Sequence, residues 1–426
     1  MPKKIWVRQT LLGVVASIVV ILLIFLPSYV NRSGQAAGTS TSTIVGQGAA
    51  AIEAAPSLDR AFVLNDADGT ISMIDLHHAS TAQTLRIGGA PYPVRIGLVI
   101  DQRAGHVFVV NGGNAVRMLD ARSGRLLHTV ILPLAPAFLS VDERTSRVFV
   151  SEVNTKKGAN VDVLDARTGL PVRRVAVGHG AGALAVDERV GHVFVQNVGE
   201  NTVSMLDARS GVELRTIALG SGPSILAQAH AIGGPLPTAV RVDEQTSRAF
   251  VTRFGGVSVL DTRSGALVRT TPAGRIPSDI AVDVRTNRVF VTNLEEGTMS
   301  MLDARTGRTL NTIHVGLRPW AVAVVASVGR VCVANAGDDS VSILDAGSGR
   351  VVRTVPVGVR PTAIAVDART SRVYVVNMVA YRPTESSWER LGNSLSRLQS
   401  ALSFLSRPSL GTGSIPGSVS IVSVTR

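Results

Sequence analysis

The chain is poor in cysteine, lysine and aromatic residues. Its 426 residues include one cysteine, Cys332, which excludes an intramolecular disulfide framework and a cysteine-based zinc site. Only four residues are lysine, so arginine carries nearly all the positive charge behind the formal net charge of +12. That charge is compatible with an anionic partner such as nucleic acid or a lipid surface. A genomic base bias toward Arg, Ala and Val codons also explains it, and this is the interpretation that we favour.

The sequence also lacks the motifs on which most enzymes rely. It has no nucleophile motif, no phosphate-cradling glycine loop and no histidine pair at metal-ligand spacing. His77 and His78 are adjacent and would point apart in a strand. The stretch "NDADGT" (65–70) resembles part of a calcium loop, but it lacks the downstream bidentate Glu and lies where a turn is expected. We therefore expect no catalytic residues, no metal and no cofactor.

The N-terminal region reads as a membrane anchor. Residues 9–31 carry no charge, and 23 such residues can cross a hydrocarbon core of about 30 Å as a helix. Lys3, Lys4 and Arg8 precede this run, which places the N-terminus in the cytoplasm and the rest of the chain outside. The sequence thus predicts a cytoplasmic tip and transmembrane signal anchor over 1–31 and a linker over 32–39. A signal peptide cleaved near Ala36 and Ala37 is the alternative.

The rest of the chain is a repeat array. "RVFVTNLEEGTMSMLDARTGRTLNTIHVG" (288–316) recurs as "RVCVANAGDDSVSILDAGSGRVVRTVPVG" (330–358). Each unit predicts four strands: a small-residue strand such as "DIAVD" (279–283), then "RVFVTN", "TMSMLD" and "TLNTIHVG". Small side chains suit a first strand where radial sheets converge on an axis. The "DARTGR" between the third and fourth strands is typical of a hairpin turn, which explains its Asp without any chemistry.

The few aromatic residues are mostly used in one place. The second strand has an aromatic at the same position in seven units, and Cys332 takes that position in another; the aromatics are Phe62, Phe108, Phe149, Phe194, Phe250, Phe290 and Tyr374. This strand is apolar on both faces, as expected when neighbouring sheets cover both sides. We therefore predict that these side chains pack between units and that Cys332 is a buried thiol. Aromatics used in this way argue against a base-stacking surface.

Counting the strands predicts the architecture. Second strands begin near residues 61, 107, 148, 193, 249, 289, 331 and 373. The chain begins with a fourth strand near 40–46, runs through seven complete units and ends on the third strand "SVSIVSV". We predict an all-β, eight-bladed β-propeller over 40–426, closed by the N-terminal strand, because closure protects an otherwise bare edge. A seven-bladed ring is the alternative.

The repeat wording, "VAVDxRTxRVFVTNxxxxTVSMLDxxTGRxLxTIxVGxxP", resembles the YVTN-repeat β-propeller family of bacterial and archaeal surface and periplasmic proteins. The resemblance covers about residues 40–426 and implies an extracytoplasmic binding or scaffold protein. Related propellers include lactonase-like enzymes, cofactor-enzyme subunits and a periplasmic single-stranded DNA binder. The fold alone does not choose among these functions.

Two insertions predict which face of the propeller binds. Residues 220–237 join a fourth strand to the next first strand, and residues 378–416 separate the second and third strands of the last blade. Both connections belong to the same face, which favours binding there, although capping of the ring opening is the alternative. The second insertion predicts an amphipathic helix that packs on the propeller or contacts a partner or the membrane. Its apolar stripe is Trp388, Leu391, Leu395, Leu398, Leu402 and Leu405.

The same face contains the candidate ligand-binding residues. Those in or beside fourth-to-first connections are Trp320, Arg318, Arg360, Tyr92, His179 and His230. Second strands end in asparagines, among them Asn293, Asn335 and Asn377, whose amides would bind sugars or phosphates; Asn is also a favoured turn residue.

Together these patterns favour a single-pass membrane protein whose propeller lies outside the cytoplasm. We expect it to bind a protein or cell-envelope ligand without catalysis. A lactonase-like or other propeller hydrolase is one alternative, and a binder of nucleic acid or another polyanion is the other.

Overall fold

The computed structural model describes residues 40–88, 96–152, 158–220, 238–379 and 416–425. The chain divides into two units, 1–39 and 40–426, and the description below concerns the second. The predicted membrane anchor and the predicted helix at 388–405 lie outside the described residues. Within those residues, we find no helix with the length and apolar character needed to span a membrane.

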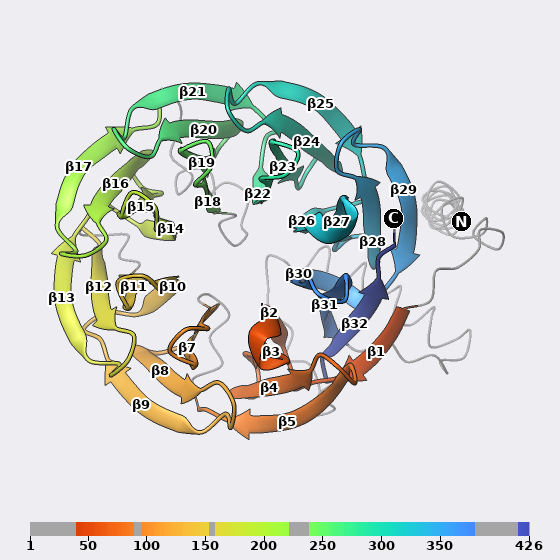
Figure 1. The fold of residues 1–426 in the computed structure, drawn as a ribbon, viewed down its shortest axis with the longest axis horizontal. Helices are drawn as coiled ribbons and strands as arrows, with labels where there is room; N and C mark the ends of the chain where they lie inside the picture. The colour runs from red at the N-terminus through yellow and green to blue at the C-terminus, as the bar shows by residue number, and fades with distance from the viewer. Residues whose placement is uncertain (1–39, 89–95, 153–157, 221–237, 380–415, 426) are drawn as a thin grey trace, which may run out of the picture. The chain divides into compact units, whose positions relative to one another are not determined.

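The described strands form eight four-stranded antiparallel sheets arranged as the blades of a ring (Figure 1). Blade 1 consists of β2 (Ala49–Ala55), β3 (Arg60–Asn65), β4 (Thr70–Asp75) and β5 (Ser80–Arg86), and blade 2 of β6 (Ile96–Asp101), β7 (His106–Asn111), β8 (Ala115–Asp120) and β9 (Leu126–Ile131). Blade 3 consists of β10 (Pro136–Asp142), β11 (Arg147–Glu152), β12 (Asn160–Asp165) and β13 (Pro171–Ala176), and blade 4 of β14 (Ala181–Asp187), β15 (His192–Asn197), β16 (Thr202–Asp207) and β17 (Glu213–Ala218). Blade 5 consists of β18 (Val240–Asp243), β19 (Arg248–Arg253), β20 (Gly256–Asp261) and β21 (Leu267–Pro272), and blade 6 of β22 (Pro277–Asp283), β23 (Arg288–Asn293), β24 (Thr298–Asp303) and β25 (Thr309–His314). Blade 7 consists of β26 (Pro319–Val325), β27 (Arg330–Asn335), β28 (Ser340–Asp345) and β29 (Val351–Pro356), and blade 8 of β30 (Val359–Asp367), β31 (Arg372–Val379), β32 (Ser418–Ser423) and β1 (Ser40–Ile44). Two short 3₁₀ turns, η1 (Pro56–Leu58) and η2 (Ala326–Val328), join first and second strands.

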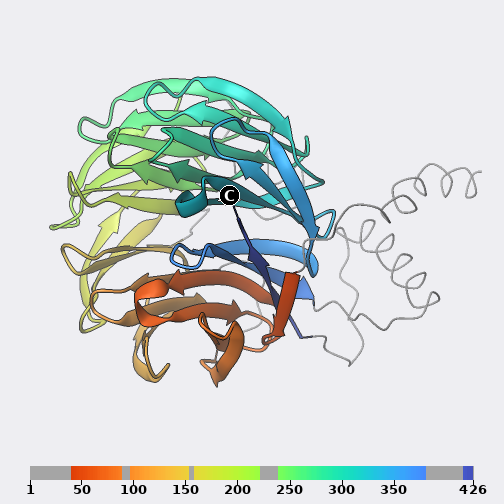
Figure 2. The same ribbon diagram turned by 45° about the vertical axis from the view of Figure 1, so that its right-hand side comes forward.

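The first strand of each blade lies nearest the ring axis and the fourth lies at the rim (Figures 1 and 2). Each first strand contacts the first strands of both neighbouring blades, and β30 of blade 8 contacts β2 of blade 1. The ring is therefore continuous. All eight predicted units form blades, so the eight-bladed prediction is confirmed and the seven-bladed alternative is wrong.

The N-terminal strand closes the ring. β1 pairs antiparallel with β32, from Ser40 opposite Val422 to Ile44 opposite Ser418, and so supplies the fourth strand of blade 8. Without β1, the edge of β32 would present unpaired backbone groups to solvent. The predicted closure by a strand near 40–46 is confirmed.

Apolar side chains fill the spaces between adjacent blades. Phe250 of blade 5, for example, packs with Val289, Val291 and Leu302 of blade 6. The second-strand aromatics are at most 1% exposed, as predicted from their shared position. Cys332 takes the same place, is fully buried, and has its thiol pKa raised to about 12 by that burial. It is the buried thiol that the repeat predicts.

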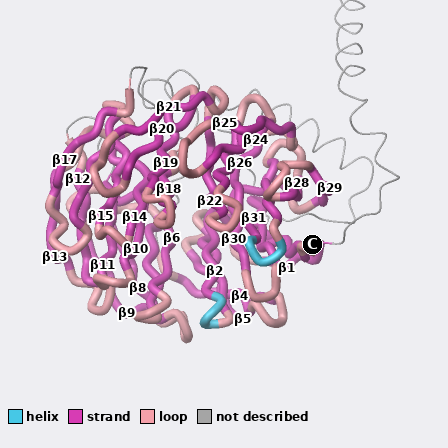
Figure 3. Tube along the Cα trace, turned by 45° about the horizontal axis from the view of Figure 1, so that its top comes forward, coloured by secondary structure: helices cyan, strands magenta, loops and turns pink. Residues whose placement is uncertain are grey.

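The two faces of the ring differ in the connections they carry (Figure 3). The upper face has the fourth-to-first and second-to-third connections, and the lower face has the first-to-second and third-to-fourth turns. At a lower-face turn, Asp303 accepts hydrogen bonds from the backbone N–H of Thr306 (2.8 Å) and from its hydroxyl (2.7 Å), and Gly307 takes a φ of 69°. The recurring Asp of "DARTGR" is a turn residue.

Candidate functional site

Two arginines lie on the upper face at the start of neighbouring first strands. Arg318 directly precedes β26 of blade 7, and Arg360 lies in the same place at the beginning of β30 of blade 8. Both side chains are exposed. Partial desolvation by the surrounding face, with the like charge of Arg318, lowers the pKa of Arg360 against the opposing charge of Asp339. The fold thus places two guanidinium groups close enough to repel one another.

The backbone at these two arginines is strained. Arg318 has a φ of 50° and Arg360 a φ of 53°, in the left-handed region that disfavours residues with a Cβ. The equivalent positions of blades 1 and 4 have similar φ values, but there the residues are Gly48 and Gly180. Arginine therefore stands where the backbone favours glycine. A strained residue that persists in this way is a reason to look for a function.

Acidic side chains nearby bond to the backbone, and the charge of Asp339 also acts on Arg360. Asp338 accepts a hydrogen bond from the backbone N–H of Leu317 (2.6 Å), and Asp339 accepts one from that of Arg360 (2.9 Å). Within the described part of the chain, neither Arg318 nor Arg360 forms a side-chain hydrogen bond or ion pair. Both guanidinium groups can therefore receive an anionic group from outside.

The other predicted residues of the connections have separate surroundings. Trp320 is partly buried and packs on the core between blades 7 and 8. His179 is exposed on the upper face and its Nδ1 contacts the carboxylate of Glu200. Tyr92 and His230 lie outside the described residues.

The predicted asparagines are buried within their own blades. Asn293, Asn335 and Asn377 are 0% exposed, and their amides donate to hydroxyl groups at the start and middle of the third strand, as Asn293 does to Thr298 (2.9 Å) and Ser300 (3.1 Å). A Cβ on Gly274, in the connection above, would lie 2.5 Å from the Asn293 amide carbon. These asparagines are therefore covered by backbone. We correct their assignment from ligand binding to blade packing.

Sequence reasoning missed three charged residues near the ring axis. Glu53 on β2 and Arg241 on β18 are exposed although they lie on first strands, and Asp279 on β22 is partly buried. Arg241 Nη2 lies 3.2 Å from Asp279 Oδ1. The sequence does contain a signal for two of them, because Glu53 and Arg241 stand at the position where other units have the small residue of "DIAVD".

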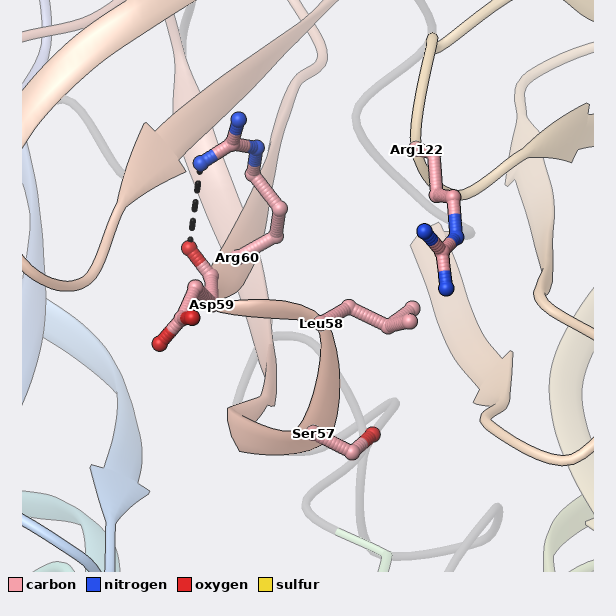
Figure 4. A pocket seen from close by; sticks show the side chains of 5 residues that line it. All are labelled: Ser57, Leu58, Asp59, Arg60 and Arg122. Atoms are coloured by element: carbon pink, nitrogen blue, oxygen red, sulfur yellow. Dashed lines mark hydrogen bonds between the residues drawn. The ribbon is translucent and has the colours of Figure 1, made fainter.

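The lower face contains a pocket in which the charged side chain of Arg60 already bonds to groups nearby. It lies between η1 of blade 1 and the β8–β9 turn of blade 2, and its lining residues are Ser57, Leu58, Asp59, Arg60 and Arg122 (Figure 4). Arg60 donates to the backbone carbonyl of Asp59 (3.2 Å) and pairs with Asp75 (3.0 Å). We do not assign a ligand to it. Across the residues that the structure describes, no three His, Cys, Asp or Glu side chains are grouped to hold a metal ion.

Comparison with known proteins supports the fold alone. No protein-family model and no curated protein matches the chain. Among solved structures, BamB from Moraxella catarrhalis is similar with a TM-score of 0.59 and 17% identity, covering 80% of this chain and 97% of that one. The computationally designed Ika8 protein has a TM-score of 0.59 at 18% identity, covering 78% of this chain and 95% of its own. Dihydro-heme d1 dehydrogenase NirN in complex with DHE has a TM-score of 0.60 at 14% identity, covering 77% and 70% respectively. The YVTN resemblance rests on the repeat wording.

Proposed function

We propose that this chain is a membrane-anchored, extracytoplasmic β-propeller that binds an anionic region of a protein or cell-envelope ligand through its upper face and carries out no chemistry. The observation that carries the proposal is the pair Arg318 and Arg360, held in left-handed backbone where blades 1 and 4 have glycine. A guanidinium group presents a planar fork of donors that matches carboxylate and phosphate groups. Two such groups in neighbouring blades suit a ligand with more than one anionic group.

The chemistry of arginine supports recognition over catalysis. A guanidinium group stays protonated in proteins, so it does not act as a general acid or base at ordinary pH. The acidic groups beside it, Asp338 and Asp339, are engaged with backbone N–H groups. The location outside the cytoplasm rests on the uncharged run at 9–31 and the positive residues before it.

The test is site-specific photocrosslinking with the full chain in its own cells. A crosslinker at Leu317, which is 63% exposed on the upper face, should form a defined adduct with a protein or envelope polymer. The double substitution Arg318→Glu and Arg360→Glu should abolish the adduct, whereas the lower-face double substitution Arg305→Glu and Arg350→Glu should leave it.

A crosslinker at Leu170, 52% exposed on the lower face, is the positional control. Equal adducts at Leu317 and Leu170, or adducts insensitive to charge reversal at Arg318 and Arg360, would refute the binding face. An adduct with nucleic acid would favour the polyanion alternative. Turnover of a lactone panel by the purified full chain, lost with the same charge reversal, would refute the non-catalytic part.

A further inference from the structure

One level of the ring axis departs from the repeat at two places. Each first strand contributes the residue that pairs with the aromatic position of its second strand; in chain order these are Glu53, Val99, Ser140, Ala185, Arg241, Ala281, Ala323 and Ala365. We call this set the axial level. Six members are small or apolar and two are charged. Glu53 belongs to blade 1 and Arg241 to blade 5, which are opposite one another in a ring of eight (Figure 1).

Solvent reaches the axial level. First strands are flanked on both sides by neighbouring blades, so a side chain that they expose faces the axis. Glu53 is exposed, and the Arg241 side chain is 50% exposed. Both charged groups are therefore within reach of a ligand that enters along the axis.

Arg241 already has its counter-ion. Its Nη2 lies 3.2 Å from Asp279 Oδ1, and its Nη1 donates to the backbone carbonyl of Val240 (3.0 Å). The other oxygen of Asp279 accepts the backbone N–H of Val322 on β26 (3.2 Å). These contacts join blades 5, 6 and 7 and neutralise the arginine.

Glu53 has no such partner. In the described part of the chain its carboxylate makes no hydrogen bond or ion pair, and Arg241 is the charged group whose field acts on it. The strands packed against β2 are β3, β6, β30 and β31, and their titratable groups are Arg60, Asp101, Arg360, Asp367, Arg372 and Tyr374. Five of these lie at strand ends, while the Tyr374 hydroxyl is buried and donates to the carbonyl of Leu76 (3.1 Å). None of them neutralises Glu53.

We propose that Glu53 and the Arg241–Asp279 pair form a ligand site on the ring axis that binds a small organic cation, a primary ammonium or guanidinium group, through the Glu53 carboxylate. When Glu53 is ionised, the carboxylates of Glu53 and Asp279 and the guanidinium group of Arg241 leave a net negative charge near this level. An anion would meet an arginine that is already neutralised. The alanine and valine side chains around Glu53 suit the aliphatic stem of a lysine, an arginine or an alkylamine.

The proton on Glu53 provides a second signature. The ring surrounds this carboxyl group on all sides even though its side chain meets solvent, and this desolvation raises its pKa to about 7 against the opposing field of Arg241. A bound cation would favour the ionised form, so binding would release a proton. Affinity for the cation should therefore increase as pH rises from 6 to 8.

The experiment is ligand-observed NMR of n-butylammonium with the purified full chain in detergent. We expect Glu53→Gln, which keeps the shape and removes the charge, to weaken binding about tenfold or more and to abolish its pH dependence. Glu213→Gln, on the fourth strand β17 at the rim, is the matched control and should bind like the wild type. Glu53→Ala is the second variant, because Ala is the residue that four other blades have at this level, and it should behave like Glu53→Gln.

Three results would overturn the proposal: no binding of n-butylammonium to the wild type at pH 8, equal binding by Glu53→Gln, or equal loss in Glu213→Gln. A lower melting temperature of Glu53→Gln with unchanged amine binding would identify Glu53 as a structural partner of Arg241 instead. Because Arg318→Glu and Arg360→Glu should not change amine binding, failure here is distinguishable from failure of the upper-face proposal.

Discussion

Blades 3 and 6 fill the same polar space with different chemistry. In blade 6, Asn293 at the end of the second strand bonds to Thr298 and Ser300 of the third, so the network is neutral. In blade 3, Glu152 ends the second strand, and Asp162 occupies the position equivalent to Ser300. Both carboxylates bond to Arg174 on the fourth strand.

The charged network of blade 3 has one positive group for two acids. Glu152 is fully buried, and its Oε1 accepts bonds from Arg174 Nη1 (2.9 Å) and the backbone N–H of Leu134 (3.0 Å). Burial, with the neighbouring charge of Glu152, raises the pKa of Asp162 to about 7. The comparison teaches that the repeat places polar side chains between the end of the second strand and the third strand of a blade. The identity of these side chains decides whether the stability of the blade depends on pH.

The largest expected effect comes from removing the one positive group. Arg174→Met should lower the free energy of unfolding by about 3 kcal/mol, the lower end of the range for breaking a buried ion pair, because the Arg174 side chain is itself 31% exposed. Asn293→Ala in the neutral network should cost less, about 1–2 kcal/mol. Urea unfolding of the two variants measures both.

Arg173→Met is the control, since Arg173 is an exposed neighbour on the same strand, and it should change stability by less than about 0.5 kcal/mol. A smaller loss for Arg174→Met than for Asn293→Ala would contradict the comparison.

The second expected effect is on pH dependence. The folded state holds a proton on Asp162 up to about pH 7, whereas the unfolded chain releases it near the ordinary Asp value, so the folded state binds more protons between these limits. The contribution of Asp162 to the free energy of unfolding is complete at low pH and is lost as pH rises through about 7. The stability of the wild type relative to Asp162→Asn should therefore fall by about 2 kcal/mol between pH 5 and 8.

The difference between the two proteins isolates the Asp162–Glu152 pair, because Glu53 and Asp66, whose pKa values are also raised by burial, are present in both. A constant difference from pH 5 to 8 would mean that Asp162 is ionised throughout.

The smallest expected effect is from converting blade 3 to the chemistry of blade 6. The substitutions Glu152→Asn, Asp162→Ser and Arg174→Thr are combined with Pro133→Gly, since the asparagine needs a residue without a Cβ above it. Replacing a buried ionic network as a unit is often neutral or stabilising, so we expect a change within about 1 kcal/mol at pH 7.

The same protein without Pro133→Gly should be less stable, because the proline ring would occupy the space that Gly274 leaves open above Asn293. Thermal unfolding of the two versions at pH 7 measures the difference, and equal stability would show that the glycine is dispensable.

The repeat made the fold predictable. A strand pattern that recurs eight times identifies each blade even where one copy is degenerate, and the surplus fourth strand at 40–46 implies closure. The site was less predictable, because it consists of departures from the repeat. Arg318 and Arg360 were identified by their place in the connections, but their left-handed backbone becomes apparent only when "GLR" and "GVR" are aligned with "GQG" and "GHG".

The axial charges and the buried asparagines depend on distances in the folded ring, which a single sequence does not reveal. Glu53 and Arg241 are separated by four blades along the chain, and only the closed ring places them at one level. The asparagines were ambiguous for another reason, since Asn is common both in exposed turns and in buried networks. Burial decides between these roles, and burial depends on the glycine of the preceding connection.

Closure by β1 also imposes an order in time. β1 leaves the ribosome before any other strand of the propeller, but its partner β32 follows about 370 residues later. At roughly 5–20 residues per second, the first strand waits about 20 to 75 s for its partner. Its sequence, STSTI, offers little for other chains to adhere to during that interval, since Ile44 is its only large apolar residue. The polar composition of β1 therefore limits association of the nascent chain with other chains before the ring closes.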